Sequence, residues 1–180
     1  MRMSKTKQGA ESVEWFTPQY VLDYVQHVMP NHTIDIDPCW SPKSHVNATI
    51  CYGKEDDGLT KDWIGNVFMN PPYGKPIPYW IVKFLDEYSE GNIRNGIMLI
   101  PLKMETKWFR AIANRCKFMD IFDHRIKFDT SEGNSGQTGW FASALVYFGE
   151  DFSESMPILP CCYRILFSER VLPKFHSKEM

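Results

Sequence analysis

The sequence contains no long hydrophobic run, no internal repeat and no low-complexity tract. Its longest apolar stretch, residues 96–102, is interrupted by Pro101, and it is far shorter than the roughly 20 residues that span a bilayer. The basic residues 1–7 lead into a polar stretch, whereas a secretory signal continues into an apolar one. We therefore expect no membrane span and no secretory signal.

A disulfide framework is also missing, because the five cysteines are odd in number and scattered along the chain. Reduced thiols are typical of an intracellular protein, so the predicted location is a cytoplasm. Cys39, His45 and Cys51 recur at intervals of six residues, but this spacing matches no compact zinc motif and a fourth ligand is not evident. No metal is expected.

The chain has no excess of basic charge. Its 20 Lys and Arg residues are outnumbered by 22 Asp and Glu residues, for a net charge of -2, which excludes a uniformly basic surface for nucleic acid. Basic charge is instead local, since residues 103–127 hold seven basic and three acidic residues. This segment is either a phosphate-binding surface or an ordinary solvated helix face.

What the sequence does contain is enough apolar material for one core. With 180 residues, 43% hydrophobic and 23% charged, the chain has the size and composition of one globular domain. We expect a single domain over residues 1–180, with a core at about 12–150 and flexible tails at 1–10 and 176–180.

Short apolar stretches alternate with stretches of helical periodicity, a pattern typical of an α/β sheet. Strands are predicted at residues 33–37, 48–52, 66–70, 96–100, 118–122 and 142–148, with an added edge strand at 163–167. Helices are predicted at 77–88 and 105–115, and a capping Thr17 with Pro18 opens a first helix that ends at Pro30. The polar, glycine-rich residues 129–139 are predicted to form a loop, as a connector or as a lid.

The most distinctive motif is Asn70-Pro71-Pro72-Tyr73, directly after a predicted strand. The carboxyl edge of an α/β sheet is where such proteins bind ligands, and two prolines remove N–H donors and stiffen the loop. The Asn70 side-chain oxygen and the Pro71 carbonyl could both accept hydrogen bonds from one –NH2 group, with Tyr73 stacked on the planar group that carries it. This arrangement suits methyl transfer to nitrogen. The alternative is a rigid turn with a packed tyrosine.

Further motifs lie on both sides of this tetrad. They are Trp15-Phe16-Thr17-Pro18 before the first helix, Asp35-Ile36-Asp37-Pro38-Cys39 at the end of the first strand, Asp57-Gly58-Leu59, Leu99-Ile100-Pro101-Leu102-Lys103, and Arg125-Ile126-Lys127-Phe128. Together with the tetrad, they resemble the amino-group DNA methyltransferases, most closely the small phage-type (Dam-like) DNA N6-adenine methyltransferases, over roughly residues 15–148.

The resemblance implies a fold, a methyl donor and a partner. The implied fold is α/β: a single Rossmann-like methyltransferase domain with a mostly parallel central sheet, helices on both faces and a C-terminal β-hairpin. The implied methyl donor is S-adenosylmethionine and the implied partner is DNA. The location would be the host cell cytoplasm if the chain is phage-encoded.

The resemblance also implies roles for individual residues. The cofactor-binding residues are Trp15, Phe16, Thr17, Pro18, Asp37, Pro38 and Asp57. The catalytic residues are Asn70, Pro71, Pro72 and Tyr73. DNA phosphates are predicted to contact Lys103, Lys107, Arg125 and Lys127.

The sequence departs from the family pattern at the cofactor site. The Gly-x-Gly turn of many methyltransferases is absent, and no acid lies between Asp37 and Glu55 to grip the ribose hydroxyls. Asn47 is predicted to replace that acid, on its hydrogen-bonding chemistry alone.

The sequence therefore predicts methyl transfer to the N6 amine of adenine in DNA, by direct attack of a flipped base. No separate target-recognition domain is visible, so selectivity is low or comes from residues 129–139. Two alternatives stay open. The same scaffold could methylate a protein glutamine or cytosine, or it could be a catalytically inactive nucleic-acid-binding module.

Overall fold

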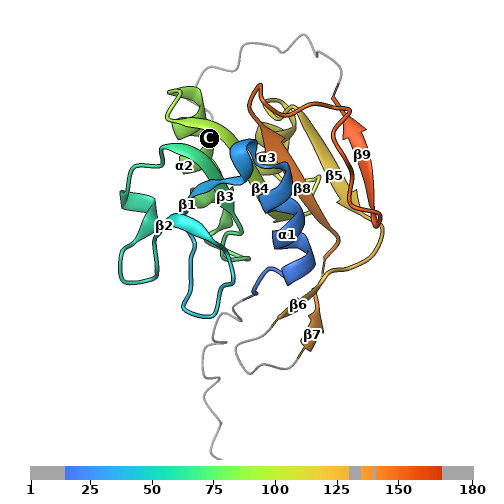
Figure 1. Cartoon of the computed structure of the whole chain (residues 1–180), viewed down its shortest axis with the longest axis horizontal. Helices are drawn as coiled ribbons and strands as arrows, with labels where there is room; N and C mark the ends of the chain where they lie inside the picture. The colour runs from blue at the N-terminus through green and yellow to red at the C-terminus, as the bar shows by residue number, and fades with distance from the viewer. Residues whose placement is uncertain (1–14, 130–134, 140, 168–180) are drawn as a thin grey trace, which may run out of the picture.

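One seven-stranded sheet organises the chain (Figure 1). The computed structural model describes residues 15–129, 135–139 and 141–167. The strand order is β2-β1-β3-β4-β8-β5-β9. The strands are β1 (Ile34–Asp37), β2 (Ala48–Cys51), β3 (Gly65–Met69), β4 (Ile93–Pro101), β5 (Phe118–Phe122), β8 (Ser143–Phe148) and β9 (Cys162–Leu166).

The two halves of the sheet differ in strand direction. The pairs β1·β2, β1·β3 and β3·β4 are parallel. The pairs β4·β8, β5·β8 and β5·β9 are antiparallel. The chain is therefore an α/β protein with a mixed sheet. The prediction of a mostly parallel sheet was wrong, because β8 and β9 run antiparallel to their neighbours and make half of the strand pairings antiparallel.

The predicted C-terminal hairpin does not form between β8 and β9, because both strands pair with β5, which lies between them. The predicted edge strand at 163–167 is present as β9. An antiparallel pair forms elsewhere: β6 (Lys127–Asp129) pairs with β7 (Ser135–Thr138). The loop predicted at 129–139 therefore contains a strand, and its residues 130–134 lie outside the described part of the chain.

Helices cover both faces of the sheet, as predicted. In Figure 1, α1 (Gln19–Val28) lies on one face, and α2 (Ile77–Ser89) and α3 (Lys107–Ala113) lie on the other. Strand β4 shows why both faces need cover. Its Ile97 and Leu99 pack with the α1 core, whereas Met98 and Ile100 pack with the α2 and α3 core, since successive side chains in a strand point to opposite faces.

Two short 3-10 helices complete the fold, at Pro30–His32 and Gly58–Thr60. In the described residues, no helix has the length and apolar character needed to cross a membrane. Nor do those residues contain a group of three or more His, Cys, Asp or Glu side chains that could hold a metal ion.

The start of α1 differs from the prediction. The helix begins at Gln19, its N-cap is Pro18, and no side chain caps it. The Thr17 hydroxyl, which was expected to cap this helix, instead accepts a hydrogen bond from the Asn70 side chain. The prediction was wrong because it considered only local partners for a hydroxyl that a distant residue reaches. In α3 the expected kind of cap is present, since Thr106 Oγ1 accepts from the Phe109 N–H at 3.2 Å.

Candidate active site

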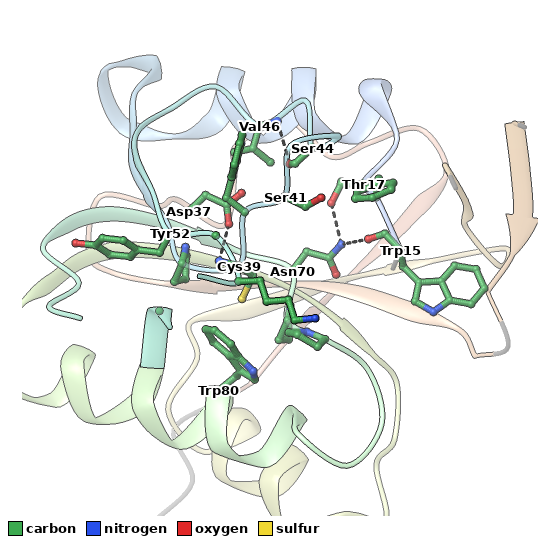
Figure 2. A pocket seen from close by; sticks show the side chains of 18 of the residues that line it. Trp15, Thr17, Asp37, Cys39, Ser41, Ser44, Val46, Tyr52, Asn70 and Trp80 are labelled. Atoms are coloured by element: carbon green, nitrogen blue, oxygen red, sulfur yellow. Dashed lines mark hydrogen bonds between the residues drawn. The ribbon is translucent and has the colours of Figure 1, made fainter. Parts of the chain in front are cut away.

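A pocket of about 350 Å³ lies where β1 and β3 end (Figure 2). Its volume is in the range of small-molecule sites. The predicted site residues that line it are Trp15, Phe16, Thr17, Asp37, Pro38, Asp57, Asn70, Pro71, Pro72 and Tyr73. The fold thus gathers four separate sequence motifs into one cavity.

Two predicted cofactor residues do not line this pocket. Pro18 is the N-cap of α1. Asn47 is exposed and precedes β2. A ribose contact by Asn47 stays a prediction.

Asn70 has one satisfied and one unsatisfied end. Its Nδ2 donates to the Trp15 carbonyl at 3.0 Å and to Thr17 Oγ1 at 3.1 Å. Its Oδ1 is buried and has no hydrogen-bond partner among the described residues. Figure 2 shows the amide nitrogen turned toward Trp15 and Thr17 and the oxygen turned away from them. A buried acceptor without a partner costs about 1–3 kcal/mol, and a donor on a ligand would remove that cost.

Residues 15–17, which accept the hydrogen bonds from Asn70, are also attached to strand β6. Phe16 and Asp129 exchange two backbone hydrogen bonds, each of 3.1 Å. This bridge joins the segment before α1 to strand β6. Phe16 is 6% exposed, so the attachment also has a buried side chain.

Tyr73 lines the pocket and is half-buried. The hydroxyl is buried and lies near Ser143, but neither hydroxyl makes a hydrogen bond of ordinary geometry. Burial raises the pKa of Tyr73 above its usual range, so the phenol is protonated near neutral pH. The ring meets Phe128 edge to face, with centroids 5.9 Å apart. Trp15 contacts the same Phe128 ring at 5.5 Å.

Asp37 supplies a buried carboxylate. It is 3% exposed, and its Oδ1 accepts from the Cys39 N–H at 3.0 Å. Among the described residues it forms no ion pair. Burial raises its pKa to about 7, and the Cys39 hydrogen bond offsets part of that rise. A buried carboxylate that lines a pocket and has no ion-pair partner among the described residues is suited to bind a cationic group of a ligand.

The wall formed by Asp57 and Gly58 is tightly packed. Asp57 is exposed and has a left-handed backbone, with φ 50°. A Cβ added at Gly58 would lie 2.2 Å from the Pro38 carbonyl oxygen, so only glycine fits there. The Gly58 carbonyl accepts from the indole of Trp63 at 2.8 Å, and Trp63 stacks on Trp80.

Three aromatic lining residues were missed by the sequence analysis: Trp40, Tyr52 and Trp80. Trp80 lies in the first turn of α2. Because this helix begins shortly after the tetrad, the sequence could have indicated that Trp80 lies near the site. Trp40 and Tyr52 lie in irregular chain and had no such pattern.

None of the four predicted phosphate-binding residues lines the pocket. Lys103 follows β4 and places its Nζ 4.2 Å from the centre of the Phe141 ring. Lys107 is the first residue of α3 and is exposed. Arg125 precedes β6 and Lys127 begins it, and both are exposed.

An α/β sheet with a proline-stiffened pocket at the carboxyl ends of its strands is the arrangement in which α/β proteins bind ligands. A family model described as DNA N-6-adenine-methyltransferase (Dam) matches residues 3–168. The chain belongs to this family and is an adenine-specific DNA methyltransferase. A comparison with curated proteins finds no significant match.

Proposed function

We propose that this pocket transfers a methyl group from S-adenosylmethionine to the N6 amine of an adenine that has left the DNA duplex, on a Rossmann-like scaffold. The observation that carries the proposal is the buried Asn70 Oδ1, an acceptor without a partner in a pocket. The exocyclic amine of adenine is a two-proton donor of matching chemistry.

The tetrad then acts as an amine-binding loop. Asn70 Oδ1 and the Pro71 carbonyl accept hydrogen bonds from the two N6–H groups, which raises the electron density on nitrogen without a strong base. Pro72 limits the motion of the loop. The ring of Tyr73, which lines the pocket, stacks on the base. A stacked base cannot reach such a pocket, so the adenine must leave the helix.

The residues present fit the methyl donor. The ammonium group of its amino acid end would meet Asp37, the buried carboxylate that has no ion-pair partner among the described residues. Asp57, Pro38 and the segment 15–17 line the same pocket and would hold the rest of it. When bound, S-adenosylmethionine supplies an electrophilic methyl group on a sulfonium.

DNA contacts are assigned to four basic residues outside the pocket: the half-buried Lys103 and the exposed Lys107, Arg125 and Lys127. Such residues position the duplex through its phosphates and carry no sequence information directly. The proposed location is a cytoplasm, that of the host cell if the chain is phage-encoded.

The experiment is transfer of labelled methyl from S-adenosylmethionine to unmethylated DNA, followed by nucleoside analysis. We expect the label in N6-methyladenine. We expect Asn70→Ala to lower the rate by about 100-fold or more, as loss of a hydrogen bond aimed at the reacting group does in other enzymes, with cofactor affinity retained. Asn114→Ala, at the end of α3 and outside the pocket, is the matched control.

Other outcomes identify other functions. Label in a different nucleoside, or in protein, would replace adenine as the acceptor. Cofactor binding without transfer, or no cofactor binding at all, would contradict the proposed reaction. Unchanged turnover in Asn70→Ala would remove Asn70 from its assigned role.

A further inference from the structure

We propose that Thr17 and the Trp15 carbonyl are positioning groups that fix the orientation of the Asn70 amide, so that Oδ1 faces the pocket and asparagine is selected over aspartate at this position. This inference rests on the proposed function of Asn70 as an amine acceptor. It assigns Thr17 a role toward a protein side chain in addition to any contact with the cofactor.

The Trp15 carbonyl decides the orientation. An asparagine side chain has an oxygen and a nitrogen end of nearly equal shape, and only hydrogen-bond partners distinguish them. A backbone carbonyl accepts and cannot donate. The atom 3.0 Å from the Trp15 oxygen must therefore be Nδ2. The opposite orientation would set two acceptors against each other.

Thr17 provides the second acceptor for Nδ2, at 3.1 Å. Its side chain is available because it does not cap α1. Thr17 is 4% exposed, so water has little access to replace its hydroxyl. With both amide protons bound to the segment before α1, Oδ1 is the only polar atom of the side chain left for a ligand.

The positioning groups are held by the chain on either side of Phe16. Phe16 uses its N–H and C=O on Asp129 of β6, while the carbonyl of Trp15 points to Asn70. Successive peptide groups of an extended segment point in opposite directions. The segment therefore connects β6 and the end of β3 through two different sets of backbone groups.

Selection against aspartate follows from the same geometry. A carboxylate accepts hydrogen bonds from an amine more strongly than an amide does. If the amine were the only partner, Asn70→Asp would be harmless or beneficial. In this site, however, the carboxylate oxygen that takes the place of Nδ2 would lie against the Trp15 carbonyl, which cannot donate, and the Thr17 hydroxyl could satisfy only part of its charge.

The first test compares Thr17→Val with Thr17→Ser. Valine keeps the shape of threonine without the hydroxyl, and serine keeps the hydroxyl. We expect valine to lower kcat about tenfold, the effect of one hydrogen bond, and serine to stay within about twofold of the parent. Cofactor affinity is measured in parallel by calorimetry. Loss of affinity with unchanged kcat would overturn the positioning role and leave Thr17 as a cofactor contact.

A second readout does not depend on turnover. The side-chain NH2 protons of Asn70 give an NMR signal that Asn70→Asp removes, which assigns it. We expect slow exchange of these protons with solvent in the parent protein and in Thr17→Ser, and faster exchange in Thr17→Val. Equal exchange rates in all three proteins would overturn the proposal. This test is valid even if the protein methylates no DNA, because it measures the hydrogen bonds of Asn70 directly.

The third test is the pH dependence of Asn70→Asp. We expect its activity relative to the parent to be about 100-fold lower at about pH 8 and to recover by at least about fivefold at about pH 6. A protonated carboxyl can donate to the Trp15 carbonyl, as Nδ2 does. A constant ratio, or an Asp variant as active as the parent, would overturn selection of asparagine.

The parent must be measured at each pH because other groups in the pocket titrate. The titratable residues that line it with Asn70 are Asp37, Cys39, Tyr52, Lys54, Asp57 and Tyr73. The pKa of Asp37 is about 7, within the range of the experiment. Taking the ratio to the parent removes this shared contribution. If the parent protein is inactive but its Asn70 NH2 protons exchange slowly, and faster in Thr17→Val, the proposed reaction is rejected and the positioning role of Thr17 is retained.

Discussion

Two buried carboxylates, Asp37 and Asp120, have opposite surroundings. Asp120 lies in β5 and is 0% exposed. Arg164 of β9 donates to both of its oxygens, each at 2.7 Å, and the Tyr24 hydroxyl donates to Oδ2 at 3.3 Å. Asp37, which is 3% exposed, has one backbone hydrogen bond and no cation among the described residues.

The difference separates a structural carboxylate from a binding one. Burial of an unpaired charge is expensive, and at Asp120 the chain itself provides the cation. Arg164 also lies over the Phe118 ring at 4.3 Å, which fastens edge strand β9 to the sheet. At Asp37 the cost of burial stays in the free protein and raises the pKa. A ligand with a positive charge can remove that cost.

The largest effect is expected from Arg164→Ala. The substitution leaves Asp120 buried without its cation, and breaking a buried pair in this way costs about 3–5 kcal/mol. We expect the free energy of unfolding to fall by that amount in urea titrations near neutral pH. Arg115→Ala, at an exposed arginine, is the control. An equal loss of stability in this variant would show that the Arg164–Asp120 ion pair does not cause the effect.

Asp37→Asn should remove a destabilising charge, whereas Arg164→Ala removes a stabilising one. The pKa of Asp37 is about 7 in the folded protein, against 3.8 ordinarily, so between these values the folded state binds more protons than the unfolded state. Stability of the free parent protein should therefore fall as pH rises from about 4 to about 7, by up to about 3 kcal/mol. The asparagine variant should lack this part of the slope. Parallel curves for the two proteins would contradict the raised pKa.

The same variant should bind S-adenosylmethionine about 10–100-fold more weakly, because a charge-assisted hydrogen bond is lost. Calorimetry at a fixed pH above 7 measures this directly. Unchanged affinity would show that Asp37 does not meet the charged end of the cofactor, and the contrast with Asp120 would then lose its functional meaning.

The smallest effects are expected at the four basic residues outside the pocket. Replacing Lys103, Lys107, Arg125 or Lys127 singly by Ala should weaken DNA binding several-fold and lower the salt slope of log K by about 1 each. Fluorescence anisotropy over a range of salt concentrations provides both values. Arg94→Ala is the control, because Arg94 is exposed and lies at the other end of β4. An equal loss of DNA affinity in this variant would mean that the position of the basic residue does not matter.

Much of this site could be predicted from residue patterns. Alternation and helical spacing located β1, β3, β4, β5, β8 and the helices, because burial of one face imposes those periods. The Asn70 tetrad directly after a strand indicated the carboxyl edge. The strand pairings could not be predicted in the same way, and the hairpin expectation failed because β5 lies between β8 and β9.

The sequence by itself determined which side chains were available: an amide, two prolines and a ring after β3, a carboxylate after β1, and a basic segment beyond β4. Only the tertiary structure decided how they are used. Thr17 and Trp15 reach Asn70 from 53 and 55 positions away, and Asp37 is left without a cation while Asp120 has one. Hydrogen bonds and ion pairs depend on the direction and distance of individual atoms, and packing sets both.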